Sequence, residues 1–320
     1  MAEVMITGGT GFIGSHLVRD CLARRDRVIV ISRPGSDPWR LAGVAANIDL
    51  VRLHPLDTAG LARLVRQVRP RHVFHLAAAT RLAGGDASDL THAMAANLAP
   101  LQALLEVLDA ADPPPDSLVR TGTLAELGEA PVILTEEARE RPTTAYGLSA
   151  LMGTHLLRMT SPGRSYAAVT ARLSLTYGGD QDRSFLVADC IAKALDGMPL
   201  TIRRPGSERD LLHVDDVVAA LQLIARHAGR LPDQVSVSTG RPVRMANLCR
   251  IIRSAVTGSP GPDRSLPDAP HPLAGRLSCH LSPALRALGW RPAIPLDRGV
   301  AQVVAWERAA RHHQDKERLA

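Results

Sequence analysis

Near the start of the chain, residues 4–15 read Val4-Met5-Ile6-Thr7-Gly8-Gly9-Thr10-Gly11-Phe12-Ile13-Gly14-Ser15, and this stretch decides the fold. A short apolar run typical of a buried strand leads into a glycine-rich turn, and helical periodicity follows from Phe12 to Arg24. The turn carries the spacing Gly9-x-Gly11-x-x-Gly14 and equally Gly8-x-x-Gly11-x-x-Gly14. The pattern predicts a strand, a tight turn and a helix in immediate succession.

Glycines at these positions suit the binding of a phosphate group. They permit the tight turn and let a pyrophosphate approach backbone N–H groups at a helix N-terminus, where the helix dipole favours anions. An ordinary glycine-rich turn is the alternative, but the place of the motif between a first strand and a first helix favours a dinucleotide. We therefore expect cofactor contacts from Gly8, Gly11, Phe12, Ile13 and Gly14.

Short apolar runs alternate with helical patterns through the first half of the chain. Strands are expected at Val4–Thr7, Val28–Ser32, Ile48–His54, His72–Ala78, Ser117–Thr123 and Ala167–Leu175. Helices are expected at Phe12–Arg24, Ala59–Val68, Leu90–Ala111 and Thr144–Met159. Continuous apolar strands that alternate with helices indicate a parallel sheet covered on both faces. The sequence therefore predicts an α/β fold with a doubly wound Rossmann sheet.

After Gly178-Gly179 the alternation weakens, which indicates a second and less regular part. A stretch rich in Gly, Pro and Asp, Gly258–Pro272, is typical of an exposed loop. We expect a dinucleotide-binding domain at 1–178 and a smaller α+β substrate-binding domain at 179–320, partly interleaved with the first. Helices of this second part, mixed with short strands, are expected at Leu186–Leu195, Asp215–Ala228, Ala246–Val256 and Pro295–Arg311.

The composition excludes several classes of protein. Hydrophobic residues make up 45% of the 320 residues, enough for a sizeable core. The formal charge of +6 comes from scattered arginines, since only Lys193 and Lys316 among the 38 basic residues are lysines. Phe, Trp and Tyr number three each, too few for the stacking platforms of a single-strand binder, so we expect no nucleic-acid partner. No window of 18 apolar residues is free of charges, so no membrane span is expected.

The first residues of the chain and its cysteines indicate the cellular compartment that we expect for the protein. The chain enters a strand pattern directly after Met1, which leaves no room for a signal peptide. The four cysteines show no CxxC or other metal-ligand spacing. His72 and His75 would face opposite sides of a strand and could not easily share a metal. We expect a cytoplasmic protein with reduced structural thiols and no metal.

The type of dinucleotide depends on the end of the second expected strand, Val30-Ile31-Ser32-Arg33. An acid about 20 residues after the phosphate loop would bind the ribose hydroxyls of NAD, and neither closing position is acidic. A hydroxyl followed by a guanidinium suits the 2′-phosphate of NADP, because arginine binds phosphate bidentately. Asp37 lies nearby and could replace the missing acid. We expect NADP(H) bound by Ser32 and Arg33, with NAD(H) as the alternative.

Further motifs follow in order along the chain. They are His75-Leu76-Ala77-Ala78, Asn97, Thr121 to Gly128, Thr135-Glu136, and Arg209-Asp210-Leu211-Leu212-His213-Val214-Asp215-Asp216-Val217. With the loop at Thr7–Ser15, they resemble the extended short-chain dehydrogenase/reductase family, the NAD(P)-dependent epimerase/dehydratase group that acts on nucleotide sugars. The resemblance covers nearly the whole chain. It implies cofactor contacts from Leu76, Ala77, Ala78 and Asn97.

The catalytic helix is where the sequence departs from this family. The family signature is Tyr-x-x-x-Lys, and here it reads Tyr146-Gly147-Leu148-Ser149-Ala150. The resemblance implies that the lysine binds the nicotinamide ribose and lowers the pKa of the tyrosine through its charge. Loss of such an acid–base partner costs on the order of 10²–10⁴ in rate. Both lysines lie far along the chain and His155 points to the opposite side of the helix, so we expect no local group to replace the amine.

The resemblance also assigns roles to single residues. Tyr146, which also contacts the cofactor, would exchange a proton with the substrate oxygen, and Thr123 would hydrogen-bond the same oxygen, with Thr121 as the nearest rival. Asp57 would contact the adenine ring or cap the helix that starts there. We expect Thr80 and Arg81, after the fourth strand, to line the sugar pocket. Arg209 would hold the nucleotide diphosphate by a charge-assisted fork, with a surface salt bridge as the alternative.

These observations favour an NADP(H)-dependent oxidoreductase that reduces a nucleotide-linked 4-keto-6-deoxyhexose. One alternative is an NAD-dependent nucleotide-sugar epimerase or dehydratase, which recycles a bound cofactor. A dehydratase also needs an acid–base pair beside the catalytic hydroxyl, and Leu124-Ala125 does not provide one. Another alternative is a sensor that binds a dinucleotide without turnover, which Ala150 would suit. The family resemblance further implies pairing into a homodimer through two long helices.

Overall fold

The computed structural model describes residues 2–80, 87–258 and 275–319. Its largest element is a seven-stranded sheet with the strand order β10-β6-β5-β4-β1-β2-β3, and every neighbouring pair is parallel. The strands of this sheet are β1 (Glu3–Thr7), β2 (Arg27–Ser32), β3 (Asp49–Arg52), β4 (His72–His75), β5 (Ser117–Thr123), β6 (Ala167–Leu173) and β10 (Gln234–Val237).

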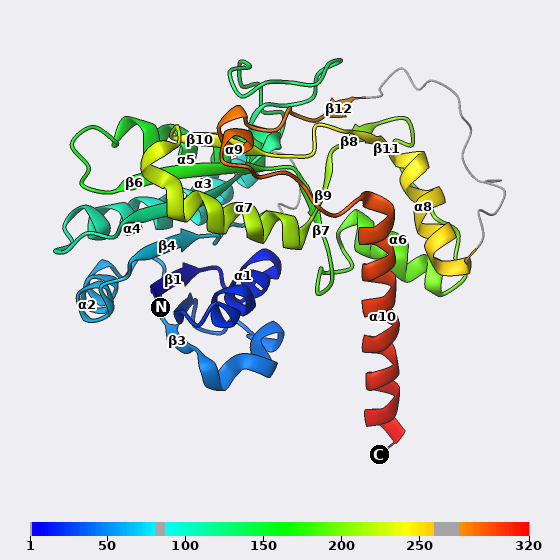
Figure 1. The fold of residues 1–320 in the computed structure, drawn as a ribbon, viewed down its shortest axis with the longest axis horizontal. Helices are drawn as coiled ribbons and strands as arrows, with labels where there is room; N and C mark the ends of the chain where they lie inside the picture. The colour runs from blue at the N-terminus through cyan, green and yellow to red at the C-terminus, as the bar shows by residue number, and fades with distance from the viewer. Residues whose placement is uncertain (1, 81–86, 259–274, 320) are drawn as a thin grey trace.

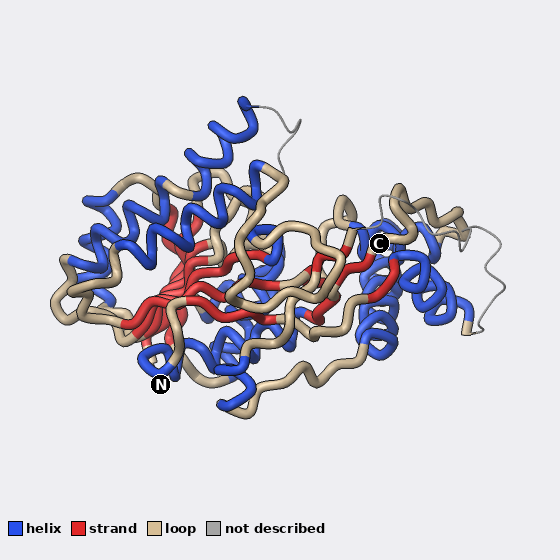
Figure 2. Tube along the Cα trace, turned by 90° about the horizontal axis from the view of Figure 1, so that it is seen from above, coloured by secondary structure: helices blue, strands red, loops and turns tan. Residues whose placement is uncertain are grey.

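Helices cover both faces of this sheet, as the view from above shows (Figure 2). One face packs on α1 (Phe12–Ala23) and α7 (Val214–His227), and its core includes Val4 and Ile6 of β1. The core of the other face includes Met5, because successive side chains of a strand point to opposite sides. The helices of this second face are α2 (Thr58–Val68), α4 (Ala99–Asp109) and α5 (Ala145–Met159), with α3 (Ala87–Asn97) against α4 and α5. The predicted doubly wound α/β fold is confirmed.

A smaller part lies beside the sheet and has its own apolar core (Figure 1). Its helices are α6 (Leu186–Leu195), α8 (Met245–Thr257) and α10 (Leu296–Leu319). The short α9 (Pro283–Ala287) packs instead on the core of the large sheet, through Leu285. Two small sheets belong to the same half: β7 (Leu175–Tyr177) with β9 (Leu211–His213), and β11 (Val243–Arg244), β8 (Glu208–Arg209) and β12 (Arg276–Leu277). Three short 3-10 segments complete the chain: η1 (Trp39–Asn47), η2 (Leu124–Glu126) and η3 (Ala228–Arg230).

The two halves are interleaved along the chain. After β9 the chain returns to the large sheet with α7 and β10 and then leaves it again. The predicted division into domains at 1–178 and 179–320 therefore stays a proposal. The return of α7 and β10 to the large sheet is the kind of interleaving that this prediction includes.

The strand order reverses between β1 and β4, because the chain builds β1-β2-β3 to one side and β4-β5-β6 to the other. The loops at the carboxyl ends of β1 and β4 diverge at this switch point, where open α/β sheets bind ligands. The topology thus places the loop after β1, the end of β2 and the end of β4 around one crevice.

Several expected boundaries were wrong. The expected helix Leu90–Ala111 is two helices, α3 and α4, because Pro100 near the start of α4 has no N–H to continue the ladder. Strand β4 ends at His75, and Leu76 to Ala78 are loop. Strand β6 ends at Leu173, and β7 belongs to another sheet. The last helix continues past Arg311 to Leu319. The loop expected at Gly258–Pro272 lies almost wholly outside the described residues.

Candidate active site

The phosphate loop joins β1 to α1 and has the close packing that its glycines allow. Gly8 has φ of +73°, and a Cβ there would lie 2.5 Å from the backbone nitrogen of Ala77. A Cβ on Gly14 would lie 2.2 Å from the carbonyl oxygen of Gly8. The backbone nitrogen of Gly11 donates to that same oxygen over 3.0 Å, and α1 begins at Phe12. The loop therefore presents free backbone N–H groups at a helix N-terminus, as phosphate binding requires.

A cleft opens between this loop and the ends of β2 and β4. Ser32 at the end of β2 is buried, and its hydroxyl has no hydrogen-bond partner among the described residues. The exposed Arg33 lines the same cleft, and its side chain forms no ion pair in the described part of the chain. The cleft fits a dinucleotide, because the glycines leave room that a Cβ would fill and Ser32 offers an unused hydroxyl. The described residues lining it are Thr7, Gly8, Thr10, Gly11, Ile31, Ser32, Arg33, Ser36, Leu53, His54, Pro55, Leu61, His75, Leu76, Ala77, Ala78, Ala79, Ala96, Pro100 and Leu104.

The loop after β4 is fastened by Asn97 at the end of α3. The Asn97 side chain accepts from the backbone nitrogen of Ala79 over 2.6 Å and donates to the carbonyl of the same residue over 3.1 Å. It also donates to the hydroxyl of Ser149, which in turn donates to the carbonyl oxygen of Tyr146. Asn97 thus links the cleft wall to α5, and its predicted contact with the cofactor stays a prediction.

The remaining predicted site residues lie at different distances from this cleft. Asp57 caps α2, because its Oδ1 accepts from the backbone nitrogen of Gly60 over 2.8 Å. Thr80 is exposed just beyond the cleft, and Arg81 lies outside the described residues. Arg209 lies in the smaller half on β8, where its guanidinium pairs with Glu129. Capping by Asp57 is therefore confirmed, and the contacts of Asp57, Thr80 and Arg209 with a ligand stay predictions.

Tyr146 and Thr123 meet at the carboxyl edge of the sheet. Tyr146 is in the first turn of α5, which Thr144 caps by accepting from the nitrogen of Gly147 over 3.0 Å. Thr123 ends β5, and its Oγ1 accepts from the nitrogen of Ala125 over 3.2 Å. The hydroxyl proton of Thr123 is then free to be donated, and a hydrogen bond from Thr123 to Tyr146 lowers the pKa of the phenol. Thr123 rather than its rival Thr121 is therefore the threonine whose hydroxyl acts on the pKa of Tyr146.

Charged groups around Tyr146 act on its pKa in opposite directions. Burial raises the pKa of the phenol above its ordinary value, and the carboxylate of Glu126 raises it further. The guanidinium of Arg120 lowers the pKa of Tyr146, but the balance remains a raised pKa. Tyr146 is therefore protonated at neutral pH and suited to donate a proton.

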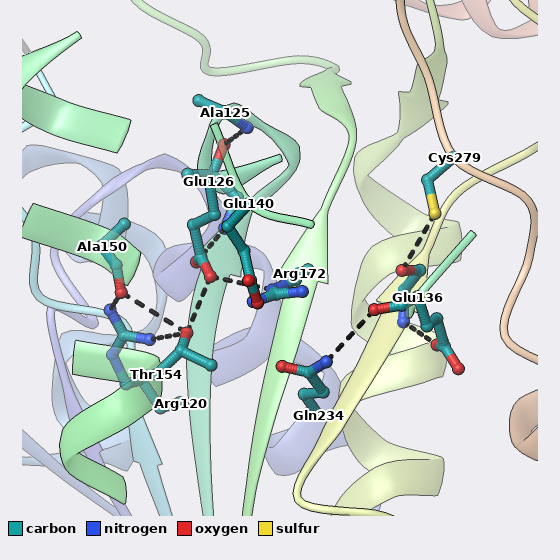
Figure 3. A network of polar contacts seen from close by, with 12 residues as sticks. Arg120, Ala125, Glu126, Glu136, Glu140, Ala150, Thr154, Arg172, Gln234 and Cys279 are labelled. Atoms are coloured by element: carbon teal, nitrogen blue, oxygen red, sulfur yellow. Dashed lines mark hydrogen bonds and ion pairs between the residues drawn. The ribbon is translucent and has the colours of Figure 1, made fainter. Parts of the chain in front are cut away.

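A layer of buried polar side chains lies between β5, β6 and α5 (Figure 3). Glu126 Oε2 binds the Nε of Arg172 over 2.8 Å and accepts from the hydroxyl of Thr154 over the same distance. Arg172 reaches on to Glu140 over 2.9 Å. Arg120 of β5 donates to Thr154 over 3.1 Å, which joins the two buried arginines through Glu126.

One contact of this layer bears on the expectation that no local group replaces the missing amine, which stays a prediction. Arg120 donates from Nη2 to the carbonyl oxygen of Ala150 over 2.8 Å, so a positive charge does lie against this turn of α5 (Figure 3). Sequence reasoning missed it because it searched only lysines and the helix itself. The sequence feature that could have indicated this contact is Arg120 itself, a charged residue inside the apolar strand 117–123.

The two histidines of β4 are tied to separate partners. His75 Nδ1 lies 2.8 Å from the hydroxyl of Thr7, and His72 Nδ1 lies 2.9 Å from that of Ser117. Burial lowers the pKa of His75 to about 3, so its ring is neutral. In the described part of the chain, no three His, Cys, Asp or Glu side chains gather as metal ligands would. No helix there is long and apolar enough to span a bilayer.

Comparison with known proteins gives a consistent result. Residues 4–238 match the model of the NAD dependent epimerase/dehydratase family. The dTDP-glucose 4,6-dehydratase of Xanthomonas campestris pv. campestris strain B100 is 27% identical over 342 residues, which cover 96% of this chain and 93% of the relative. The fold is similar to that of the UDP-glucose 4-epimerase of Thermus thermophilus in complex with NAD, with 28% identity, a TM-score of 0.81 and coverage of 96% and 99%. The fold is also similar to that of the dTDP-glucose 4,6-dehydratase of Streptomyces venezuelae with NAD bound. That comparison has 25% identity and a TM-score of 0.82, and it covers 97% of this chain and 98% of the other.

Proposed function

The chain belongs to the NAD dependent epimerase/dehydratase family, and we propose that it reduces the 4-keto group of a nucleotide-diphosphate-linked 6-deoxyhexose with NADPH. The observation that carries this proposal is the pairing of the Tyr146 and Thr123 hydroxyls at the carboxyl edge of the sheet, beside a dinucleotide cleft that Arg33 lines. The relatives in the preceding comparison act on nucleotide sugars by name, which supports this substrate class.

The protonation state of Tyr146 favours reduction over oxidation. When bound, the dinucleotide would supply the hydride. Tyr146 would give its proton to the substrate oxygen, and Thr123 would donate a hydrogen bond to the same oxygen. At neutral pH Tyr146 is in the neutral form, which is the form that can donate a proton. An enzyme that first oxidises a sugar carbinol needs the opposite, a tyrosinate that accepts the proton.

The wall of the cleft supports NADP(H). Arg33 and the unpartnered Ser32 hydroxyl both line the cleft, where a 2′-phosphate would find a charge and a donor. Asp37, the substitute acid for NAD, turns to the backbone instead and accepts from the nitrogen of Trp39 over 3.0 Å. NAD(H) remains the alternative because relatives with this fold were solved with NAD.

The environment of Thr123 disfavours dehydration. The two residues after it are Leu124 and Ala125, neither of which is an acid or a base. The carboxylate that follows, Glu126, is buried and bound to Arg172, so it is not available for proton transfer to a sugar. An NAD-dependent epimerase is the second candidate, and the similarity to the UDP-glucose 4-epimerase favours it. A sensor without turnover is the third, and Ala150 favours it.

The smaller half would hold the nucleotide sugar. We assign Arg209 to its diphosphate, which would replace Glu129 as the partner of the guanidinium. Thr80 and Arg81 would line the sugar side.

A homodimer through α3 and α5 is also proposed, since Met152 and Met159 are exposed on α5 at 39% and 72%. Sedimentation velocity of wild type and of Met152→Glu/Met159→Glu tests it: a wild-type dimer that the variant splits is expected, and a wild-type monomer refutes it.

One set of measurements separates the candidate functions. The purified protein is denatured and the released nucleotide is identified by mass spectrometry, and oxidation of NADPH and NADH is then followed with 4-keto-6-deoxyhexoses linked to dTDP or UDP. We expect an exchangeable cofactor and oxidation of NADPH. Tightly held NAD without net NADPH oxidation would favour the epimerase instead. Reversible binding of NADPH with no turnover of any sugar would favour the sensor.

A further inference from the structure

Arg120 carries a buried positive charge that no carboxylate of the described residues neutralises directly. Its side chain stands on β5 and is 4% exposed. Its bonds go to two neutral acceptors, the carbonyl oxygen of Ala150 and the hydroxyl of Thr154. Among the described residues no carboxylate lies within ion-pair distance of it. Burying a charge without a direct counter-ion costs several kcal/mol, so a sequence keeps one where the charge is used.

The facing helix is shaped to receive this guanidinium. A Cβ on Gly153 would lie 2.4 Å from Nη2 of Arg120 and 2.6 Å from its Cζ. Ala150 is buried one turn earlier and presents only a methyl group. Gly153 and Ala150 lie three residues apart and therefore on one face of α5. The strand supplies the cation and the helix supplies the space and the acceptor.

Of the charged side chains near Tyr146 that the structure describes, Arg120 is the cation without a direct anionic partner. Glu126 on η2 is bound to Arg172 of β6, which also holds Glu140 from the loop before α5. His75 on β4 is neutral, because burial and the charge of Arg120 lower its pKa to about 3. Thr123 is uncharged. Arg120 is thus the group among these whose charge stabilises a developing tyrosinate without being tied to a carboxylate.

We propose that Arg120 is a positioning residue that takes over the electrostatic task of the amine missing at position 150, with its guanidinium reaching the same turn of α5 from β5 and stabilising the anionic form of Tyr146. This inference rests on the proposed role of Tyr146 as the proton donor. It explains how a chain with Ala150 keeps a usable acid–base tyrosine. The charge comes from a residue 30 positions earlier in the chain.

The tyrosine itself provides the test, because the chain has only three. Tyr166 donates to Asp109 and Tyr177 is deeply buried, and the pKa of each lies far above its ordinary value. Tyr146 is the most exposed of the three, and its resonance is followed separately from the other two. Protein labelled with ¹³Cζ-tyrosine is titrated with base and followed by NMR, without cofactor or substrate, and Tyr146→Phe assigns the resonance.

The informative variant is Arg120→Gln, which keeps donors for the two neutral acceptors but removes the charge. We expect the Tyr146 midpoint to rise by about one pH unit or more, and to return close to wild type in Arg120→Lys. Adding Ala150→Lys to Arg120→Gln should lower the midpoint again, because the charge then comes from the helix. His155→Asn, on the exposed side of the same helix, should leave the midpoint unchanged.

An unchanged midpoint in a folded Arg120→Gln protein, judged by circular dichroism, would overturn the proposal and leave Arg120 a structural residue. If Arg120→Gln does not fold, Gly153→Ala is titrated instead, since its methyl group displaces the guanidinium. A raised midpoint then supports the proposal, and an unchanged one refutes it. The titration needs no turnover, so a protein that oxidises no NADPH but shows these shifts would refute the proposed function alone.

Discussion

Glu126 and Arg172 form an ion pair that is fully buried between η2 and β6. The Nε–Oε2 distance is 2.8 Å, and the two side chains are 0% and 1% exposed. The second carboxylate oxygen of Glu126 accepts from the backbone nitrogen of Thr123 over 3.0 Å. The pair, which Figure 3 shows, therefore ties Thr123 at the end of β5 to the neighbouring strand β6.

Removing one charge of this pair should destabilise the protein strongly. We expect Glu126→Gln to lower the free energy of unfolding by about 3–5 kcal/mol, because it leaves Arg172 buried without its closest partner. Urea denaturation measures it. Asp116→Asn is the matched control, since Asp116 pairs with Arg71 in solvent and such pairs contribute about 1 kcal/mol or less. Equal losses of unfolding free energy in the two variants would contradict the stabilising role assigned to the buried Glu126–Arg172 pair.

The phenol of Tyr146 should be required for turnover but not for cofactor binding. We expect Tyr146→Phe to lower kcat for reduction of the 4-keto sugar by about 10²–10⁴, because the proton donor is lost. The Kd of NADPH, from fluorescence titration, should stay within about twofold. Tyr166→Phe removes a hydroxyl that donates to Asp109 far from the site and should keep wild-type kcat. Full activity in Tyr146→Phe would exclude it as the donor.

Arg33 should decide between the two dinucleotides. We expect Arg33→Ala to weaken NADPH binding by about 10- to 100-fold, the value of a charge-assisted bond to phosphate, and to leave NADH binding nearly unchanged. Calorimetric titration with each cofactor provides the comparison. Arg63→Ala removes an equal charge from the exposed side of α2 and should affect neither. Equal weakening of both cofactors by Arg33→Ala would count against a 2′-phosphate contact.

The phosphate loop should not tolerate a methyl group at Gly14. A Cβ there would lie 2.2 Å from the carbonyl oxygen of Gly8, so the loop must shift to accommodate it. We expect Gly14→Ala to abolish measurable dinucleotide binding in the same titrations. Gly43→Ala is the control, because nothing lies within 4 Å of its Cβ position. Wild-type affinity in Gly14→Ala would place the cofactor elsewhere.

His75 should make the fold sensitive to mild acid. Burial, and then the charge of Arg120, lowers the pKa of His75 from 6.5 to about 3. Between these pH values the unfolded chain binds a proton that the folded chain does not, so stability falls as the pH drops from about 6.5 toward 3. The contribution is at most about 1.4 kcal/mol per pH unit.

Urea denaturation between pH 6.5 and pH 5 isolates this contribution. The loss of stability over that interval should be smaller in His75→Asn than in wild type, whereas the exposed His155→Asn should match wild type. The same loss in all three proteins would mean that His75 carries its ordinary proton in the folded state.

Patterns confined to neighbouring residues predicted the structure well. The loop from Gly8 to Gly14 and helix α6, expected at Leu186–Leu195, lie where the sequence places them. Boundaries failed where a local pattern continued past a break in hydrogen bonding. Pro100 divides an apolar helical stretch into two helices, and β6 stops at Leu173 although the next strand begins two residues later.

The sequence alone determined the parallel sheet, the phosphate loop and the absence of a lysine at position 150. Each was recognised from local patterns, namely apolar runs that alternate with helical periodicity, the spacing of the glycines, and the residue four positions after Tyr146. Folding alone determined that Arg120 lies against Ala150 and that Glu126 is held by Arg172. These pairs join β5 to α5 and η2 to β6 across 30 and 46 positions, and such distances close only when the sheet and helices pack. The residue at position 150 therefore gives an incomplete account of this turn of α5, because the guanidinium of Arg120 on a neighbouring strand binds its carbonyl oxygen.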